Sequence, residues 1–186
     1  MVDGKKSCKI VMVGDTDSGK SCLIENYLHN AFSDDYEPTV LDIYRGPKNI
    51  NREMVELEIH DTSGDEHIAS NRKVVYKEAD LFLLCCNAVH RSSLDNIPKW
   101  KAEIREVELK VPIVLLATKK DLRGIRPEDA VTSQEFKAAK KANALMGMFE
   151  TTAKEWQDRN VHKAFEKSIK VALDFAYGGN ELSDDE

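Results

Sequence analysis

The stretch Gly14-Asp15-Thr16-Asp17-Ser18-Gly19-Lys20-Ser21 determines how the rest of this chain must fold. It matches the phosphate-loop pattern, in which a lysine and a hydroxyl residue follow the second glycine. The apolar run 8–13 before it is expected to be a buried strand, and 18–27 is expected to be a helix. Glycines let a backbone wrap a phosphate, and successive N–H groups supply positive potential. By itself, the motif indicates a site for a nucleoside triphosphate, or a chance glycine-rich turn.

Outward from this motif, strand-like and helix-like segments alternate to the end of the chain. The residues Gly46-Pro47 and 49–51 are expected to form the turn between the first two later strands. This alternation predicts an α/β fold with a doubly wound, mostly parallel six-stranded sheet, one antiparallel edge strand, and helices on both faces. The expected strands are 41–44, 54–60, 81–87, 111–118 and 146–150, and the expected helices are 93–107, 133–143 and 161–176.

The length of 186 residues predicts one domain over residues 1–177, followed by an acidic flexible tail at 178–186. A net charge of −6 gives no reason to expect nucleic-acid binding. No N-terminal signal peptide is recognisable, and the apolar run 81–86 is too short to span a membrane. The four cysteines have no metal-ligand spacing and are expected to be free thiols, mostly buried, in a reducing cytosol.

A second motif, Asp61-Thr62-Ser63-Gly64-Asp65-Glu66, follows the expected strand 54–60. In a phosphate-loop site, Lys20 would reach the β- and γ-phosphates, Ser21 would bind Mg²⁺, and an acidic residue such as Asp61 would hold Mg²⁺ through water. Gly64 can offer its backbone N–H to the γ-phosphate. The alternative is an ordinary turn, which its place at a strand end after a phosphate loop disfavours.

Two further segments follow expected strands and suit recognition of a guanine base. In Thr118-Lys119-Lys120-Asp121, the carboxylate can accept two hydrogen bonds from guanine, and the stem of Lys119 can lie along the base. A site built on such bonds can discriminate between bases by roughly 10⁴–10⁵. Thr152-Ala153-Lys154 can place a backbone N–H on the guanine carbonyl. Three motifs in this order at strand ends indicate a guanine-nucleotide site.

With these motifs, the chain resembles the small GTPases of the Ras superfamily over nearly its whole length. Tyr36-Glu37-Pro38-Thr39-Val40, Lys99-Trp100 and 118–123 are similar to segments of the Rho branch. The resemblance implies that Ser21, Thr39 and Asp61 (through water) hold Mg²⁺, and that GTP or GDP is the bound nucleotide. It implies nucleotide contacts at Asp15, Thr16, Asp17, Ser18, Gly19, Lys20, Ser21, Cys22, Phe32, Tyr36, Thr39, Gly64, Thr118, Lys119, Asp121, Leu122, Thr152, Ala153 and Lys154.

The chain departs from this family at the two positions that matter most for hydrolysis. Asp65 stands where the family has the glutamine that orients water, and Thr16 stands where it usually has a glycine beside the γ-phosphate. This resembles the Rnd-type atypical Rho proteins. Residues 124–131 are also too short for the inserted helix of Rho proteins, and 180–186 lack their basic, prenylated ending. Membrane binding would then require a C-terminal lipidation signal absent from this sequence.

The resulting prediction is a Rho-like, GTP- and Mg²⁺-bound signalling protein that hydrolyses GTP very slowly and recruits effectors through its two switch regions. The resemblance implies a role in the actin cytoskeleton, a monomeric cytoplasmic protein that partners can bring to a membrane, and an exchange factor as a further partner. The alternative is an ordinary cycling GTPase with unorthodox catalytic residues, in which Glu66 or His67 restores turnover. A third reading, an interaction protein without nucleotide, conflicts with the intact Lys20, Ser21 and Asp121.

Overall fold

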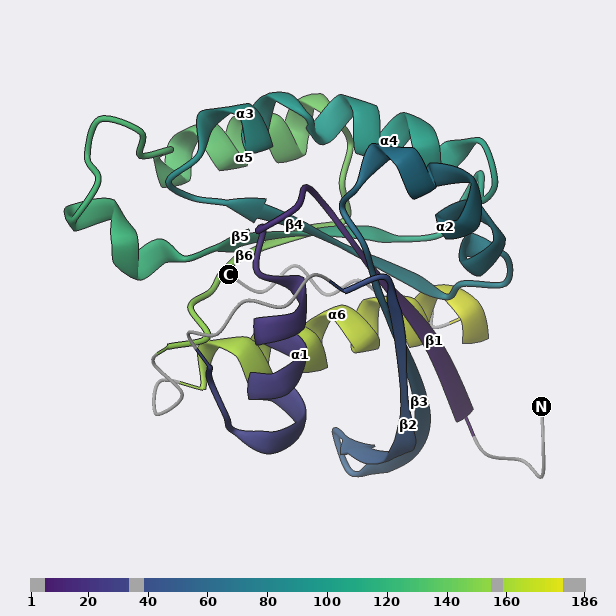
Figure 1. Cartoon of the computed structure of the whole chain (residues 1–186). Coiled ribbons are helices and arrows are strands. Elements are labelled where there is room, and N and C mark those ends of the chain that lie inside the picture. The colour runs from purple at the N-terminus through teal and green to yellow at the C-terminus, as the bar shows by residue number, and fades with distance from the viewer. Residues whose placement is uncertain (1–5, 34–38, 155–158, 179–186) are drawn as a thin grey trace.

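The computed structural model describes residues 6–33, 39–154 and 159–178, and it contains one six-stranded sheet with helices on both faces (Figure 1). The strands are β1 Lys6–Val13, β2 Leu41–Ile50, β3 Glu53–Thr62, β4 Leu81–Asn87, β5 Ile113–Thr118 and β6 Gly147–Glu150. Their order is β2-β3-β1-β4-β5-β6, and only the β2–β3 pair is antiparallel. The predicted fold class is therefore confirmed, including the antiparallel edge strand.

The helices form two layers, one on each face of the sheet (Figure 1). One layer consists of α1 Lys20–His29 and α6 Asn160–Tyr177. The other consists of α2 Ala69–Tyr76, α3 Arg91–Asp95, α4 Ile97–Arg105 and α5 Ser133–Ala142. Two short 3₁₀ helices, η1 Glu66–Ile68 and η2 Lys120–Gly124, follow β3 and β5. This arrangement leaves the carboxyl ends of the parallel strands at one open edge, where the loops gather.

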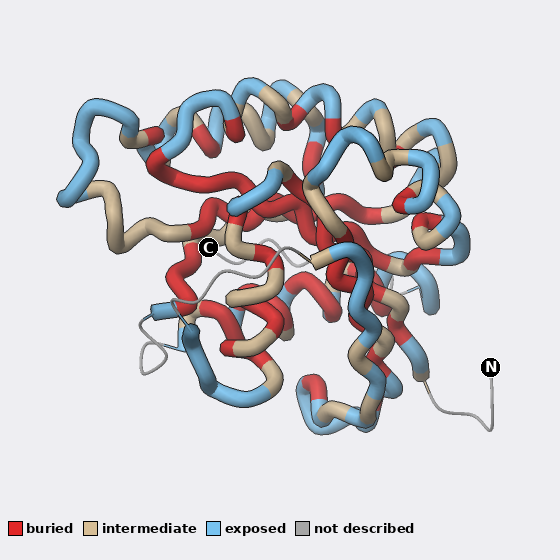
Figure 2. Tube along the Cα trace, in the orientation of Figure 1, coloured by how far each residue is buried: buried red, intermediate tan, exposed pale blue. Residues whose placement is uncertain are grey.

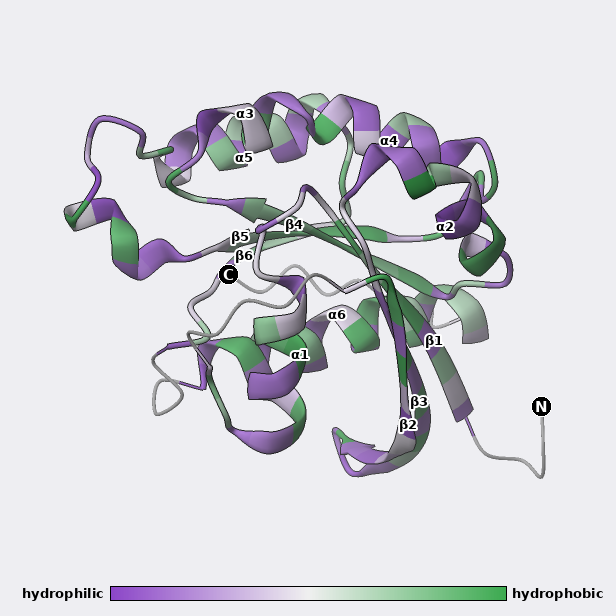
Figure 3. Ribbon diagram, viewed as in Figure 1, coloured by the Kyte–Doolittle hydropathy of each residue, from purple (hydrophilic) through white to green (hydrophobic). Residues whose placement is uncertain are grey.

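The central strands β4 and β5 are buried along their whole length (Figure 2). Leu81 and Leu83 pack in the core under α1 and α6, whereas Phe82 and Leu84 pack in the core under α4 and α5. Because alternate residues of a strand point to opposite faces, both faces need apolar side chains. This explains why the sequences of β4 and β5 are nearly continuous runs of apolar residues (Figure 3).

The expected hairpin turn is displaced along the chain. Gly46-Pro47, predicted as part of the turn, lies inside β2, and Pro47 pairs with Glu56 in the antiparallel register. The turn falls at Asn51 and Arg52, which both have positive φ angles of 49° and 69°. Proline is tolerated in β2 because this is an edge strand, where a missing N–H need not remove a ladder hydrogen bond.

The helical segment expected over 93–107 is two helices, and one helix was not predicted. α3 and α4 meet at Asn96, and Pro98 stands in the first turn of α4, where a proline fits because those N–H groups lack intrahelical partners. No helix was expected over the residues of α2. The buried residues of this helix are Arg72 and Tyr76, so its sequence has no clear helical period of apolar residues from which to predict it.

Two other expectations concern the thiols and membrane spans. Cys8, Cys85 and Cys86 are buried, Cys22 is partly buried, and all four are free. Among the residues that the structure describes, no helix is both long enough and apolar enough to cross a bilayer. The predicted tail at 178–186 lies outside the described residues, apart from Gly178, which caps the end of α6.

The start of α5 carries a complete capping box. The Thr132 hydroxyl accepts a hydrogen bond from the Glu135 N–H at 3.2 Å, and the Glu135 carboxylate accepts one from the Thr132 N–H at 2.9 Å. These bonds satisfy two backbone donors that the first turn of a helix leaves without partners. Phe136 of α5 is fully buried, so the cap stabilises the helix that carries this core residue.

Replacing Thr132 with alanine should therefore lower the free energy of unfolding by about 1 kcal/mol, the usual cost of losing an N-cap. Thr132→Ser keeps the hydroxyl and should stay within a few tenths of a kcal/mol of wild type. Urea denaturation followed by far-UV circular dichroism measures both. An equal loss in the two variants would show that the methyl group, and not the cap, supports α5.

Candidate functional site

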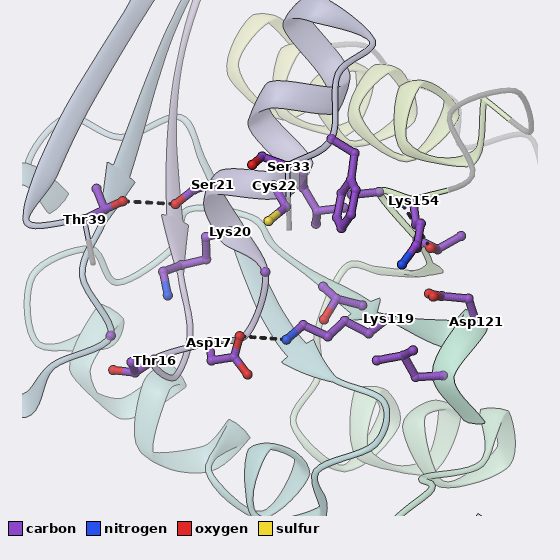
Figure 4. A pocket seen from close by; sticks show the side chains of 18 of the residues that line it. Thr16, Asp17, Lys20, Ser21, Cys22, Ser33, Thr39, Lys119, Asp121 and Lys154 are labelled. Atoms are coloured by element: carbon purple, nitrogen blue, oxygen red, sulfur yellow. Dashed lines mark hydrogen bonds and ion pairs between the residues drawn. The ribbon is translucent and has the colours of Figure 1, made fainter. Parts of the chain in front are cut away.

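One pocket lies at the open edge of the sheet, where the loops after β1, β3, β5 and β6 meet the start of α1 (Figure 4). Ligands of open α/β sheets bind at this edge, outside the carboxyl ends of the strands. Most of the predicted nucleotide contacts line the pocket, although they come from distant parts of the chain. They are Thr16, Asp17, Gly19, Lys20, Ser21, Cys22, Phe32, Thr39, Gly64, Thr118, Lys119, Asp121, Leu122, Thr152, Ala153 and Lys154.

The phosphate loop turns sharply between β1 and α1 because of its two glycines. Gly14 has a φ of +136°, and a Cβ there would lie 2.2 Å from the carbonyl oxygen of Cys85. Gly19 has a φ of +85°. Both conformations strongly favour glycine. The loop can therefore lie against β4 and place its backbone at the N-terminus of α1, where backbone N–H groups favour an anion.

Lys20 is buried at the base of this loop. Its ammonium donates hydrogen bonds to the carbonyl oxygens of Gly14 at 3.0 Å and Asp15 at 2.9 Å. Burial lowers the pKa of Lys20, and the nearby negative charges of Asp61 and Asp15 oppose that change. A cation with few water contacts, held beside a loop built for phosphates, provides concentrated positive charge at this end of the pocket.

Oxygen atoms suited to a magnesium ion gather beside the loop. The hydroxyl oxygens of Ser21 and Thr39 are 3.1 Å apart (Figure 4). Asp61 is completely buried at the end of β3, and neither of its carboxylate oxygens has a hydrogen-bond partner among the described residues. Burial raises the pKa of Asp61. A buried carboxylate without a hydrogen-bond partner is costly, so this set of hard oxygen donors fits a bound divalent cation such as Mg²⁺.

The loop after β5 is tied directly to the phosphate loop. The Thr118 hydroxyl donates to the Ser18 carbonyl oxygen at 2.7 Å. Lys119 has a φ of +56° and extends across the pocket, where its ammonium pairs with the Asp17 carboxylate at 2.8 Å (Figure 4). Because Lys119 crosses the pocket in this way, its methylene stem forms one wall of the space that Asp121 lines from η2.

The loop after β6 is held by two side chains that the sequence analysis did not identify. Asn26 of α1 donates to the Ala153 carbonyl oxygen at 2.8 Å, and Asn160 of α6 accepts from the Thr152 N–H at 2.8 Å. On the same side of the pocket, the Lys154 ammonium lies 5.6 Å from the centre of the Phe32 ring. No motif marks the two asparagines: the partner of Asn26 is 127 positions away, and the partner of Asn160 is eight residues earlier, in the loop before α6.

Some predicted contacts do not line the pocket. The side chain of Asp15 points away from it and accepts hydrogen bonds from Trp100 at 2.7 Å and Asn96 at 3.0 Å. Ser18 is buried under the loop. A nucleotide contact at either residue can therefore come only from the backbone. Tyr36 lies outside the described residues. Four lining residues were not predicted, namely Leu23, Ser33, Thr62 and Ser63.

The two residues that depart from the family pattern occupy different places. Thr16 lines the pocket, and the Gly64 backbone packs on it so closely that a Cβ at Gly64 would lie 2.1 Å from the Thr16 nitrogen. Asp65 is exposed and does not line the pocket. Its carboxylate caps η1 by accepting a hydrogen bond from the His67 N–H at 2.9 Å. Asp65 therefore has a structural role at the start of η1.

Comparisons with known proteins agree with this geometry. The model of the Ras family matches residues 9–174 of the chain. The chain is also 36% identical, over 164 residues, to the Ras-like GTP-binding protein RhoL of Drosophila melanogaster. That alignment covers 88% of this chain and 85% of the fly protein. The matched range contains nearly the whole sheet, the phosphate loop and the loop after β5, and the chain belongs to the Ras family of small GTP-binding proteins.

Proposed function

We propose that this protein is a Rho-like signalling module of Rnd type that stays bound to GTP and Mg²⁺, hydrolyses GTP very slowly and recruits effectors. The observation that carries this proposal is the separation of two sets of residues. The predicted binding residues Lys20, Ser21, Thr39 and Asp121 line one pocket, whereas Asp65, at the position of the catalytic glutamine, lies outside it and caps η1. The signalling activity of such a protein depends on its abundance and location and not on a cycle of GTP hydrolysis.

The proposed binding roles follow from the chemistry of each side chain. Lys20 binds the β- and γ-phosphates, and Ser21, Thr39 and Asp61 hold Mg²⁺, with Asp61 acting through water. When bound, Mg²⁺ neutralises charge on the phosphate oxygens. Asp121 accepts hydrogen bonds from the N1–H and the exocyclic amine of guanine. The remaining lining residues enclose the nucleotide in the single domain that we assign to residues 1–177.

Asp65 is a poor replacement for glutamine for two reasons. A glutamine amide both donates and accepts hydrogen bonds, whereas an ionised carboxylate only accepts. A carboxylate turned toward the γ-phosphate would also repel it, by an amount on the order of 4 kcal/mol for unit charges about 4 Å apart at an effective dielectric of about 20. In the structure the Asp65 carboxylate already accepts the His67 N–H, so turning toward the phosphate would break the cap of η1.

Thr16 adds a steric obstacle at the same end of the pocket. Its backbone nitrogen is in close contact with Gly64, and its side chain lines the pocket at the place where glycine leaves space in the family. An activating protein inserts an arginine beside the γ-phosphate, and that arginine is worth roughly 10³–10⁵ in rate. With Thr16 in this space, we expect activating proteins to have little effect.

Effector recruitment is supported by exposed apolar side chains in the segments that follow the pocket residues Thr39 and Gly64 in the chain. Val40, Leu41 and Ile43 are exposed directly after Thr39, and Val74 is exposed on α2. Exposed apolar groups next to a ligand-sensing segment suit a protein partner. By its resemblance to Rho proteins, we assign the protein to control of the actin cytoskeleton, as a cytoplasmic monomer that partners recruit to membranes and that an exchange factor loads with nucleotide.

The second candidate is an ordinary cycling GTPase. Glu66 and His67 stand beside Asp65 and could in principle position the water. Glu66, however, is paired with Lys99 of α4, and both Glu66 and His67 are absent from the residues that line the pocket. This arrangement favours the slowly hydrolysing protein, and the rate of a single turnover separates the two.

Freshly purified protein should release GTP when it is denatured, and loaded GTP should persist through a single-turnover assay with Mg²⁺. The physical reason is that the pocket retains its phosphate and base contacts but lacks a group that orients water. Chromatography of the released nucleotide and of timed samples measures both. Released GDP together with turnover at the rate of typical small GTPases would establish the cycling alternative.

Restoring the missing amide should restore hydrolysis. We expect Asp65→Gln to raise the single-turnover rate by roughly tenfold or more, which is below the roughly 10²–10⁴ that a well-positioned proton-transfer group contributes. Asp65→Asn is the matched control, because it removes the charge without adding reach. If Asn and Gln accelerate hydrolysis equally, charge repulsion is the main block. If neither does, Thr16→Gly combined with Asp65→Gln tests whether the steric block dominates.

Asp121→Ala should weaken binding of GTP and GDP to the same extent, because both share the guanine base. Losing two hydrogen bonds to a charged acceptor, each worth about 1.5–3 kcal/mol, corresponds to roughly 10²–10⁴ in affinity. Displacement of a fluorescent guanine nucleotide measures both dissociation constants. If ATP does not compete with wild type and Asp121→Ala has no effect, base recognition must lie elsewhere.

A further inference from the structure

Arg72 of α2 is a buried arginine that contacts the backbone on both sides of Gly64. It is only 4% exposed. One guanidinium nitrogen, Nη1, donates to the carbonyl oxygen of Ser63 at 2.9 Å and to that of Asp65 at 2.6 Å. These two carbonyls flank Gly64 in the chain. Arg72 therefore fixes the Ser63–Gly64 peptide unit, which carries the Gly64 N–H, and the Asp65–Glu66 peptide unit one residue further along.

Arg72 is itself held firmly by α4. Its Nε and Nη2 atoms donate to the two carboxylate oxygens of Glu103, both at 3.0 Å. The Tyr76 hydroxyl donates to the same carboxylate at 2.6 Å. A two-bond arginine–carboxylate pair fixes orientation as well as distance. The guanidinium can therefore transmit the position of α4 to the segment around Gly64.

The same helix is also attached to the phosphate loop. The Arg72 guanidinium lies 4.7 Å from the centre of the Trp100 ring, and the Trp100 indole N–H donates to the Asp15 carboxylate at 2.7 Å. Gly64 in turn packs on the backbone of Asp15 and Thr16. These contacts form a closed ring, which we call the α4 ring. It runs from Asp15 through Trp100 and Arg72 to the backbone on both sides of Gly64, and from Gly64 back to the phosphate loop.

We propose that Arg72 is a positioning residue that sets the preference of the pocket for GTP over GDP. It does so by holding the Gly64 N–H at the phosphate loop, where the γ-phosphate is the group that distinguishes the two nucleotides. This inference rests on the proposed binding of guanine nucleotides in the pocket. A hydrogen bond to a charged group is worth about 1.5–3 kcal/mol, which corresponds to roughly 10–150-fold in affinity. The base and the other phosphates are common to both nucleotides, and the side chains proposed to bind them, Lys20 and Asp121, lie outside the α4 ring.

The test compares the affinities of a non-hydrolysable GTP analogue and of GDP, both with Mg²⁺. We expect Arg72→Ala to lower the affinity for the analogue by tenfold or more relative to that for GDP. Arg72→Lys should show a similar loss, because one ammonium cannot replace the fork that joins Glu103 to the backbone. The matched control is Lys73→Ala. Lys73 is the next residue of α2 and also pairs with a glutamate, Glu106, the C-cap residue of α4. Among the described residues, none of its hydrogen bonds reaches the backbone around Gly64.

A second variant covers the case in which Arg72 variants fail to fold, since removing one partner of a buried ion pair is strongly destabilising. Trp100→Phe keeps the aromatic packing and removes only the donor to Asp15. We expect it to lower the ratio of the two affinities about threefold or more, with the dissociation constant for GDP nearly unchanged. If the role were merely structural, the affinities for the analogue and for GDP would fall together, and their ratio would stay unchanged.

The outcomes separate this inference from the proposed function. If wild type binds neither nucleotide, the proposed function fails. If wild type binds both, and the ratio of affinities is unchanged in Trp100→Phe and in whichever Arg72 variants fold, the inference about Arg72 is wrong and nucleotide binding stands. If Lys73→Ala lowers the ratio as much as Arg72→Ala does, the effect belongs to α2 as a whole, and the role assigned to Arg72 is also overturned.

Discussion

The close approach of Gly14 to β4 is the contact on which the rest of the pocket depends. There is no room for a side chain between this residue and the carbonyl oxygen of Cys85, and its φ of +136° strongly favours glycine. Because the loop lies this close to the sheet, Thr118 can reach the Ser18 carbonyl and Trp100 can reach Asp15. A larger residue at position 14 would lift the loop and break both attachments, so the positions of the loops after β1 and β5 depend on one steric condition.

The sequence predicted the parts of the structure that repeat a simple physical pattern. The runs 81–87 and 111–118 are apolar on both faces because helices cover both faces of the sheet, and they correspond to β4 and β5. The three motifs were expected at strand ends, and the structure brings Lys20, Asp121 and Lys154 to one pocket. A strand period and a glycine pattern are local properties, which explains why they can be recognised without the fold.

The sequence did not predict the features that depend on distant partners. Arg72 and Glu103 are 31 positions apart and were not singled out, because a buried arginine has no local signature until its carboxylate partner is placed. The division between α3 and α4 at Asn96, and the location of Pro47 inside β2, likewise depend on which strand or helix lies alongside. Asp65 was expected near the phosphates, and its role as a helix cap became visible only with the backbone of η1 in place.

The order of strands in the sheet has a consequence for how the protein is made. β1 lies between β3 and β4, so the strands that carry the phosphate loop and Gly64 can pair once residues up to Asn87 exist. Trp100 and Thr118, which hold that loop, are made later. The part of the pocket beside Asp121 also needs the loop after β6, up to Lys154. In addition, α6 is needed to cover the apolar face shared with α1. At about 5–20 residues per second, the 67 residues from 87 to 154 (154 − 87) take about 3–13 s to synthesise. During that interval, the nascent chain exposes apolar surface and has no complete site for guanine, so nucleotide cannot stabilise it until synthesis is nearly finished.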